Sequence, residues 1–90
     1  MPKAFVNPEE LRRFAHDLKR FNESLKEDLS GIHKRFLKLG ETWQDQEQAK
    51  FAETFDQMVR ALSKFADAAD KHVPFLLRKA ERIQEYLDQR

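Results

Sequence analysis

Hydrophobic residues in the first half of the chain recur at steps of three or four, which is the spacing of one face of an α-helix. They are Leu11, Phe14, Leu18, Phe21, Leu25, Leu29, Ile32, Phe36 and Leu39. Asn7 is a favourable N-cap, Pro8 suits the first helical position, and Gly40 follows the last turn as a C-terminal stop. The pattern therefore predicts one long helix over about residues 8–39.

The second half of the chain carries a similar stripe, which begins after Asp45. The stripe consists of Phe51, Phe55, Met58, Leu62, Phe65, Ala69, Val73, Leu76, Ala80, Ile83 and Leu87. Asp45 and Gln48 have the spacing of a capping box, so a second helix is expected over about residues 46–88. Pro74 lies inside the stripe and has no N–H to donate to a helix hydrogen bond. We expect a kink at Pro74, and a short break followed by a third helical piece is the alternative.

Two long helices with one short connection over about residues 40–45 predict an all-α fold, an antiparallel helical hairpin forming a single domain. A hairpin buries only part of a stripe this wide, and a large apolar patch rarely stays exposed on a soluble monomer. We therefore expect a second hairpin, from the same or a related chain, to complete a four-helix bundle. The residues expected on the core or dimer face are Leu18, Phe21, Leu25, Phe36, Phe51, Phe55, Met58, Leu62 and Phe65.

The composition narrows the class of protein further. The 90 residues include only 2 Gly and 3 Pro, which are too few for the many turns of a β-sandwich or barrel. The 17 Lys and Arg residues nearly balance the 16 Asp and Glu residues, so no basic excess indicates nucleic-acid binding. The chain has no apolar run long enough to span a membrane, and its N-terminus lacks the apolar core of a signal peptide. We expect neither membrane insertion nor a cleaved leader.

Candidate chemistry is sparse, which argues against an enzyme. The chain has no Cys, so it offers no thiolate nucleophile or thiolate metal ligand. His16, His33 and His72 do not share the i,i+4 spacing with which a helix chelates zinc. Carboxylates are spread over the solvated helix faces, and Asp67 with Lys71 has the spacing of a surface ion pair. We expect no catalytic residue, no metal and no cofactor.

The expected bend contains Trp43, the only Trp of the chain. On physical grounds, an aromatic residue at a hairpin turn covers the end of the core. The stretch Trp43-Gln44-Asp45 also resembles the Trp-x-Gly motif between the two helices of the WXG100 (ESAT-6-like) family of type VII secretion. Phe51 and Phe55 match the aromatic positions of the family, eight and twelve residues after the Trp. Asp45 stands at the glycine position of the motif, where it can cap the second helix.

The resemblance implies a small protein that is secreted without a cleaved signal peptide and acts by protein–protein recognition as a homodimer or heterodimer. It also implies that Trp43 and Asp45 at the bend face a secretion ATPase or an effector protein. Many members carry a Tyr-x-x-x-Asp/Glu export signal after the second helix, whereas here Tyr86 is followed at the fourth position by Arg90. Tyr86 is interpreted either as a remnant of that signal or as a surface aromatic residue. A cytoplasmic helical-hairpin adaptor with no export role is the alternative function.

Overall fold

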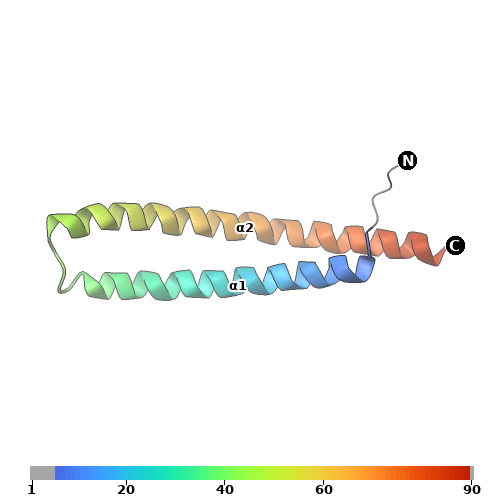
Figure 1. Ribbon diagram of the computed structural model, residues 1–90, viewed down its shortest axis with the longest axis horizontal. Coiled ribbons are helices and arrows are strands. Elements are labelled where there is room, and N and C mark those ends of the chain that lie inside the picture. Colours follow the sequence, from blue (N-terminus) through green and yellow to red (C-terminus); the bar gives the residue numbers. More distant parts are fainter. Residues whose placement is uncertain (1–5, 90) are drawn as a thin grey trace.

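The computed structural model describes residues 6–89 of the chain. These residues form two long helices, α1 (Pro8–Leu39) and α2 (Gln46–Asp88). The helices run antiparallel and lie side by side, joined by a short connection at one end of the molecule (Figure 1). The hairpin is a rod of 68 × 25 × 15 Å. The predicted all-α antiparallel hairpin of two long helices is therefore confirmed.

Capping of its N-terminus explains where α1 begins. The side-chain oxygen of Asn7 accepts hydrogen bonds from the backbone N–H groups of Glu9 and Glu10, at 2.8 and 3.2 Å. Pro8 occupies the first turn, where the missing N–H has no helical partner to lose. The two glutamates also place negative charge at the positive end of the helix dipole, which stabilises this end of α1.

The second helix, α2, is uninterrupted over 43 residues although it contains Pro74. It begins after Asp45, whose carboxylate accepts a hydrogen bond from the backbone N–H of Gln48 at 2.9 Å. Pro74 has no N–H for the carbonyl of Asp70 four residues earlier, so one hydrogen bond of the helix is missing there. The helix continues on both sides of this position (Figure 1). The alternative of a short break followed by a third helical piece is therefore wrong.

Small side chains fill the line along which the two helices meet. On α1, the buried residues recur at every seventh position: Pro8, Ala15, Asn22 and Leu29. On α2, the buried residues are Phe55, Ala66, Ala69, Val73 and Ala80. Because alanine adds little bulk, the helix axes can approach closely along this line. Several of the larger apolar side chains, among them Phe14, Phe21 and Phe65, consequently stay exposed.

The two helices differ in length, with 43 residues in α2 and 32 in α1. At a rise of about 1.5 Å per residue, the difference of 11 residues corresponds to roughly 16 Å. α1 ends and α2 begins at the bend, and at the other end of the rod the last turns of α2 extend beyond the start of α1 (Figure 1). This C-terminal overhang has no α1 residues to pack against.

Candidate functional site

The hairpin leaves a broad apolar face exposed. Phe14 and Phe21 of α1 are 56% and 55% exposed, and Phe65 of α2 is 53% exposed. Soluble monomers rarely show contiguous apolar patches larger than a few hundred Å². We name this surface the apolar face and define it by Phe14, Phe21, Ile32, Leu39, Phe51, Met58 and Phe65, all of which are exposed. It is the main candidate for a protein interaction surface.

The apolar face lies on one side of the hairpin. Consecutive residues of a helix differ by about 100° around its axis, so the neighbours of a buried residue point to opposite sides. Phe14 precedes the buried Ala15 on α1, and Phe65 precedes the buried Ala66 on α2. α1 and α2 run in opposite directions and turn their buried residues towards each other. For this reason, the residue before a buried position on α1 and the residue before a buried position on α2 point to the same side of the hairpin. Phe14 and Phe65 therefore share one side of the hairpin, and the residues that follow the buried positions share the other.

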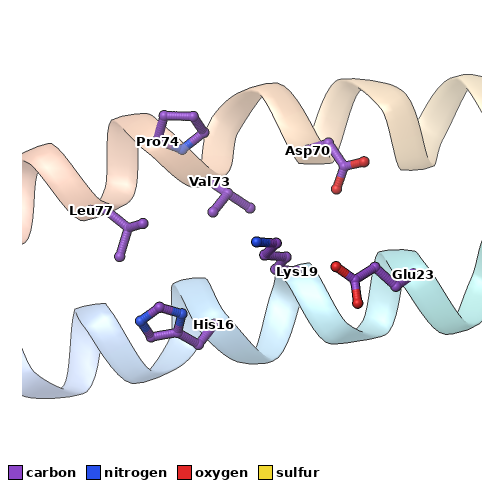
Figure 2. A pocket seen from close by; sticks show the side chains of 7 residues that line it. All are labelled: His16, Lys19, Glu23, Asp70, Val73, Pro74 and Leu77. Atoms are coloured by element: carbon purple, nitrogen blue, oxygen red, sulfur yellow. The ribbon is translucent and has the colours of Figure 1, made fainter.

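The opposite side of the hairpin carries more charged side chains. An open groove of about 380 Å³ lies between the helices there, lined by His16, Lys19, Glu23, Asp70, Val73, Pro74 and Leu77. Figure 2 shows His16 and Lys19 projecting from α1 towards α2, and Val73 and Leu77 projecting from α2 towards α1. Small-molecule sites are usually concave and bury most of the ligand. This groove is open and has a charged rim, so we assign no ligand to it.

A polar cluster on this second side ties the two helices together. The Nδ2 of Asn22 donates a hydrogen bond to Oδ1 of Asp70 at 2.9 Å. The Nζ of Lys26 lies 2.7 Å from Oδ2 of Asp70 and 3.2 Å from Oδ1 of Asp67. Asp67 thus pairs with Lys26 on the other helix, and the predicted surface pair between Asp67 and Lys71 is not formed. The cluster fixes the lengthwise alignment of α1 against α2.

The hydrogen bonds of the cluster shift the pKa values of Asp70 and Lys26. The hydrogen bond from Lys26, and after it the hydrogen bond from Asn22, lowers the pKa of Asp70 below its ordinary value. The hydrogen bonds from Lys26 to Asp70 and Asp67 raise the pKa of Lys26. Asn22 is completely buried, and its Oδ1 has no hydrogen-bond partner among the described residues. Asn22 therefore depends on Asp70 for its one side-chain hydrogen bond.

Trp43 lies at the bend and is half-buried. The centroid of its ring is 6.2 Å from that of Phe51, which lies 5.7 Å from Phe36 and 5.9 Å from Phe55. Phe36 and Phe55 are 4.7 Å apart, and Phe55 is buried between the helices. These aromatic rings close the bend end of the hairpin. The rest of the Trp43 side chain is accessible to solvent.

Asp45 occupies a backbone position that does not require glycine. Its φ of −96° and ψ of −175° are those of extended backbone, which any residue adopts. Gly40, at the end of α1, has a helical φ of −61°, and no residue of the described part of the chain has a positive φ. The side chain of Gln44 donates a hydrogen bond to the carbonyl of Gly40 at 3.1 Å. The bend is thus held by side-chain hydrogen bonds and by the Asp45 cap.

The residues predicted for the core or dimer face fall into three groups. Phe55 is buried; Leu18, Leu25, Phe36 and Leu62 are half-buried; and Phe21, Phe51, Met58 and Phe65 are exposed. Sequence reasoning missed Ala15 and Asn22, both of which are completely buried. The signal that would have found them is the seven-residue spacing of Ala15, Asn22 and Leu29. Neither alanine nor asparagine stands out when only large apolar residues are followed.

The structure does not bring Tyr86 to the bend. The connection between the helices and the C-terminal end of α2 lie at opposite ends of the rod (Figure 1). Within one chain, Trp43 and Tyr86 are therefore separate sites. Tyr86 is 69% exposed, and nearby Asp88 accepts a hydrogen bond from Nε2 of Gln84 at 2.9 Å. The position expected to hold a carboxylate, Arg90, lies outside the described residues.

The described part of the chain offers neither a metal-ion cluster nor a membrane-spanning segment. Residues 6–89 contain no group of three or more His, Asp or Glu side chains placed to hold a metal ion. Neither α1 nor α2 contains a segment long and apolar enough to cross a membrane.

Solved structures with a similar fold come from a secreted protein, EsxB of Bacillus anthracis str. Sterne. A glycine-to-alanine variant of EsxB has a TM-score of 0.73 and 24% identity, covering 93% of this chain and 97% of EsxB. Selenomethionine-labelled EsxB has a TM-score of 0.75 and 23% identity, with coverages of 96% and 98%. A glutamate-to-glutamine variant has the same TM-score and identity, with coverages of 96% and 96%. At these identities, the likeness establishes a shared hairpin fold.

The amino-acid sequence of the chain matches a known protein family. No curated protein matches the chain in sequence. The family model described as "Proteins of 100 residues with WXG" matches residues 5–88, which is nearly the whole chain. The match includes the bend with Trp43 and spans both helices, so the resemblance inferred from the bend is confirmed although Asp45 replaces the glycine. The chain therefore belongs to the WXG100 family, the helical-hairpin proteins of type VII secretion.

Proposed function

We propose that this protein is exported by a type VII secretion system and acts by protein–protein recognition as a dimer of hairpins. WXG100 proteins pair as hairpin dimers, and EsxB, which has the same fold, is described as a secreted protein. Family membership does not favour the alternative of a cytoplasmic adaptor without an export role. The partner in the dimer is an identical chain or a related hairpin.

The observation that carries this proposal is the exposed apolar face. Phe21 and Phe65 remain more than half exposed after the hairpin has formed. Full burial of a phenylalanine contributes about 1.5–3 kcal/mol, so a second hairpin that covers this face gains a large apolar contribution. The other side carries the groove with its charged rim and the ion pairs of Lys26 with Asp67 and Asp70, whose charges stay accessible to water. The two sides thus indicate which surface the partner hairpin covers.

Recognition beyond the dimer is assigned to the two ends of the rod. At the bend, Trp43 is half-buried against Phe51, and its accessible part adjoins the Asp45 cap of α2. At the other end, Tyr86 is exposed on the overhang. An exposed aromatic residue on a rigid helix is a favourable anchor for a partner. We assign the bend to contact with a secretion ATPase or an effector, and Tyr86 to a remnant of the export signal.

This function requires neither catalysis nor a cofactor. His16, Glu23 and Asp70 line the same groove, but the groove is open to water, and the lowered pKa of Asp70 comes from its hydrogen bonds with Lys26 and Asn22 between the helices. Acid–base catalysis needs groups that converge in a pocket and are free to exchange a proton with a substrate. Nucleic acid and membrane insertion have no part in the proposal.

Export is the experiment that tests the proposal. The protein is measured in the medium and in the cells of a producing strain, once with an intact secretion ATPase and once with an ATPase unable to hydrolyse ATP. We expect the protein in the medium only when the ATPase is intact, with a cytoplasmic marker protein absent from the medium as the lysis control. Retention in the cells of both strains would support the cytoplasmic adaptor instead.

A pair of variants tests the role of Tyr86 in export. Tyr86→Ala removes the exposed ring near the end of α2, and we expect it to lower the exported fraction. Gln89→Ala is the matched control, because Gln89 is also exposed and caps the same helix end. Equal export of the two variants would leave Tyr86 as a surface aromatic residue without a role in the signal.

A further inference from the structure

A row of basic residues follows the outer surface of α2. Lys64, Lys71, Arg78 and Arg82 succeed one another at steps of seven, seven and four, which keeps them on one face of the helix. Phe75 lies on the same face, four residues after Lys71. We name this surface the basic stripe and define it by Lys64, Lys71, Phe75, Arg78 and Arg82, all of which are exposed.

The positive charge of the basic stripe is not neutralised within the hairpin. The nearby acids Asp67 and Asp70 point towards α1, where both pair with Lys26. Glu81 and Glu85 lie at the C-terminal end of the stripe. Among residues 6–89, no basic side chain of the stripe forms an ion pair with these or any other acids. A chain with a net charge of only +1 thus carries a local concentration of positive charge.

Phe75 adds an apolar anchor in the middle of the stripe. Phe75 is 62% exposed, which among the large apolar residues of the described chain is matched by Leu37 and exceeded only by Tyr86. The guanidinium carbon of Arg78 lies 4.8 Å from the centroid of the Phe75 ring, and the His72 ring lies 6.3 Å from it. The cation–π contact holds Arg78 across one face of the ring. That face is closed to a stacking nucleobase, whereas the edge of the ring stays open to an apolar side chain.

We propose that the basic stripe is a docking site for an acidic segment of a partner protein. Asp or Glu side chains of the segment pair with Lys71, Arg78 and Arg82, and one apolar side chain of the segment packs against Phe75. Arginine and aromatic residues are the types most often found at the centres of protein interfaces. Eighteen residues separate Lys64 from Arg82, so the stripe is roughly 27 Å long, which matches about eight extended residues.

This site is distinct from the surface assigned to the dimer. Phe75 follows Phe65 of the apolar face by ten residues, which places it about 80° further around the helix. A second hairpin on the apolar face therefore leaves the basic stripe accessible. The stripe is also only one helix wide and is bordered by Asp67 and Glu81, a shape that suits a protein segment better than a flat anionic membrane. The inference goes beyond the proposed function and does not depend on export.

Binding of an acidic peptide to the purified full chain tests the inference. The probe is a fluorescein-labelled peptide of repeated Glu-Leu-Glu-Glu units, and the readout is fluorescence anisotropy at low and at raised salt. The test variant is Lys71→Glu with Arg78→Glu, which reverses two charges of the stripe. The matched control is Lys34→Glu with Lys38→Glu, which makes the same change of net charge at exposed positions of α1. Circular dichroism verifies that each variant retains its helix content.

We expect the stripe variant to weaken binding by at least about tenfold and the α1 control to stay within about twofold of the unmodified chain. Phe75→Ala is expected to weaken binding by about threefold without changing its dependence on salt, because it removes an apolar contact and no charge. If charge reversal reduces the helix content, the variant Lys71→Gln with Arg78→Gln takes its place, and we expect it to weaken binding of the acidic peptide by about threefold.

Three results would overturn the inference. One is an equal loss of peptide affinity in the stripe variant and in the α1 control, which would mean that binding depends only on the net charge of the chain. Another is equal binding of a peptide with Gln in place of Glu. The last is that an oligonucleotide or phosphatidylglycerol vesicles bind more tightly than the acidic peptide and lose this binding in the stripe variant. That result would assign the basic stripe to a different class of partner.

Discussion

A single charge placed on the apolar face should separate assembly from folding. Phe65→Asp is the most informative substitution, because Phe65 is 53% exposed in the hairpin and contributes little to the contact between α1 and α2. The isolated hairpin tolerates an aspartate at such an exposed position. In a dimer that covers the apolar face, the same aspartate lies in an apolar interface without a partner charge. We therefore expect helix content to persist while the dimer dissociates.

The size of the effect follows from the exposed fraction of Phe65. Full burial of a phenylalanine contributes about 1.5–3 kcal/mol, and roughly half of this remains to be gained on assembly. Two copies in a homodimer therefore lose about 1.5–3 kcal/mol of apolar contribution. Burial of each carboxylate adds a penalty of several kcal/mol unless the interface opens to water. A total of at least about 4 kcal/mol corresponds to a rise in the dimer Kd of roughly a thousandfold.

Sedimentation velocity over a concentration series measures this change, with circular dichroism as the measure of folding. Phe75→Asp is the matched control, because Phe75 is on the same helix and is at least as exposed but lies outside the apolar face. We expect the control to keep the dimer Kd of the unmodified chain. If Phe65→Asp left the dimer Kd unchanged, or if both variants weakened it equally, the apolar face would not be the dimer surface.

Two further predictions concern the bend and the polar cluster. Trp43→Ala is expected to keep helix content and to lower the Tm by several degrees, because the half-buried ring packs on Phe51 and a loss of about 1 kcal/mol shifts the Tm of a small domain by about 4–8 °C. Thermal melts followed by circular dichroism test this, and an unchanged Tm would make Trp43 purely a recognition residue. The pKa of Asp70 is lowered in the folded state, so its contribution to stability is present above its ordinary pKa and is lost as the pH falls below that range. Asp70→Asn, which removes the ion pair with Lys26, should therefore flatten the fall in stability on acidification measured by urea unfolding. Equal pH dependence for Asp70→Asn and the unmodified chain would show that the ion pair is not linked to folding.

The ends of the helices were predictable because the signals that set them are local. Asn7 and Asp45 cap the helices that follow them through hydrogen bonds to residues two or three positions away. Such contacts depend only on the order of a few residues along the chain. The continuity of α2 through Pro74 was less predictable, because neighbouring turns and the packing of α1 decide whether a helix survives the loss of one hydrogen bond.

The division of the apolar stripe into a hairpin contact and an exposed face was not predictable from the spacing. Phe14 and Ala15 are adjacent, and the periodic pattern of large apolar residues includes Phe14 and passes over Ala15. In the structure Ala15 is buried, whereas Phe14 is exposed, because close approach of the helices favours small side chains at their line of contact. A periodic pattern shows which side of a helix is apolar. It does not show whether the same chain or a second chain covers each part of that side.

Contacts between the helices were also beyond the reach of local spacing. Asp67 has the correct distance along the sequence for a pair with Lys71, but it pairs with Lys26 on the other helix. That choice depends on how α1 is aligned lengthwise against α2, which the hydrogen bond from Asn22 to Asp70 helps to fix. The bend, unlike these contacts, was predictable from local sequence, because Trp43 and the aromatic residues after it indicated the family that the comparison confirms.

The central claim is that the apolar face is covered by a second hairpin, and the mass of the native complex tests it most directly. Native mass spectrometry of the protein isolated from producing cells should give twice the chain mass of 10.8 kDa, or 10.8 kDa plus the mass of one related hairpin of similar size. Either mass places four helices in the complex. A single species of 10.8 kDa at concentrations well above the micromolar range would contradict the claim.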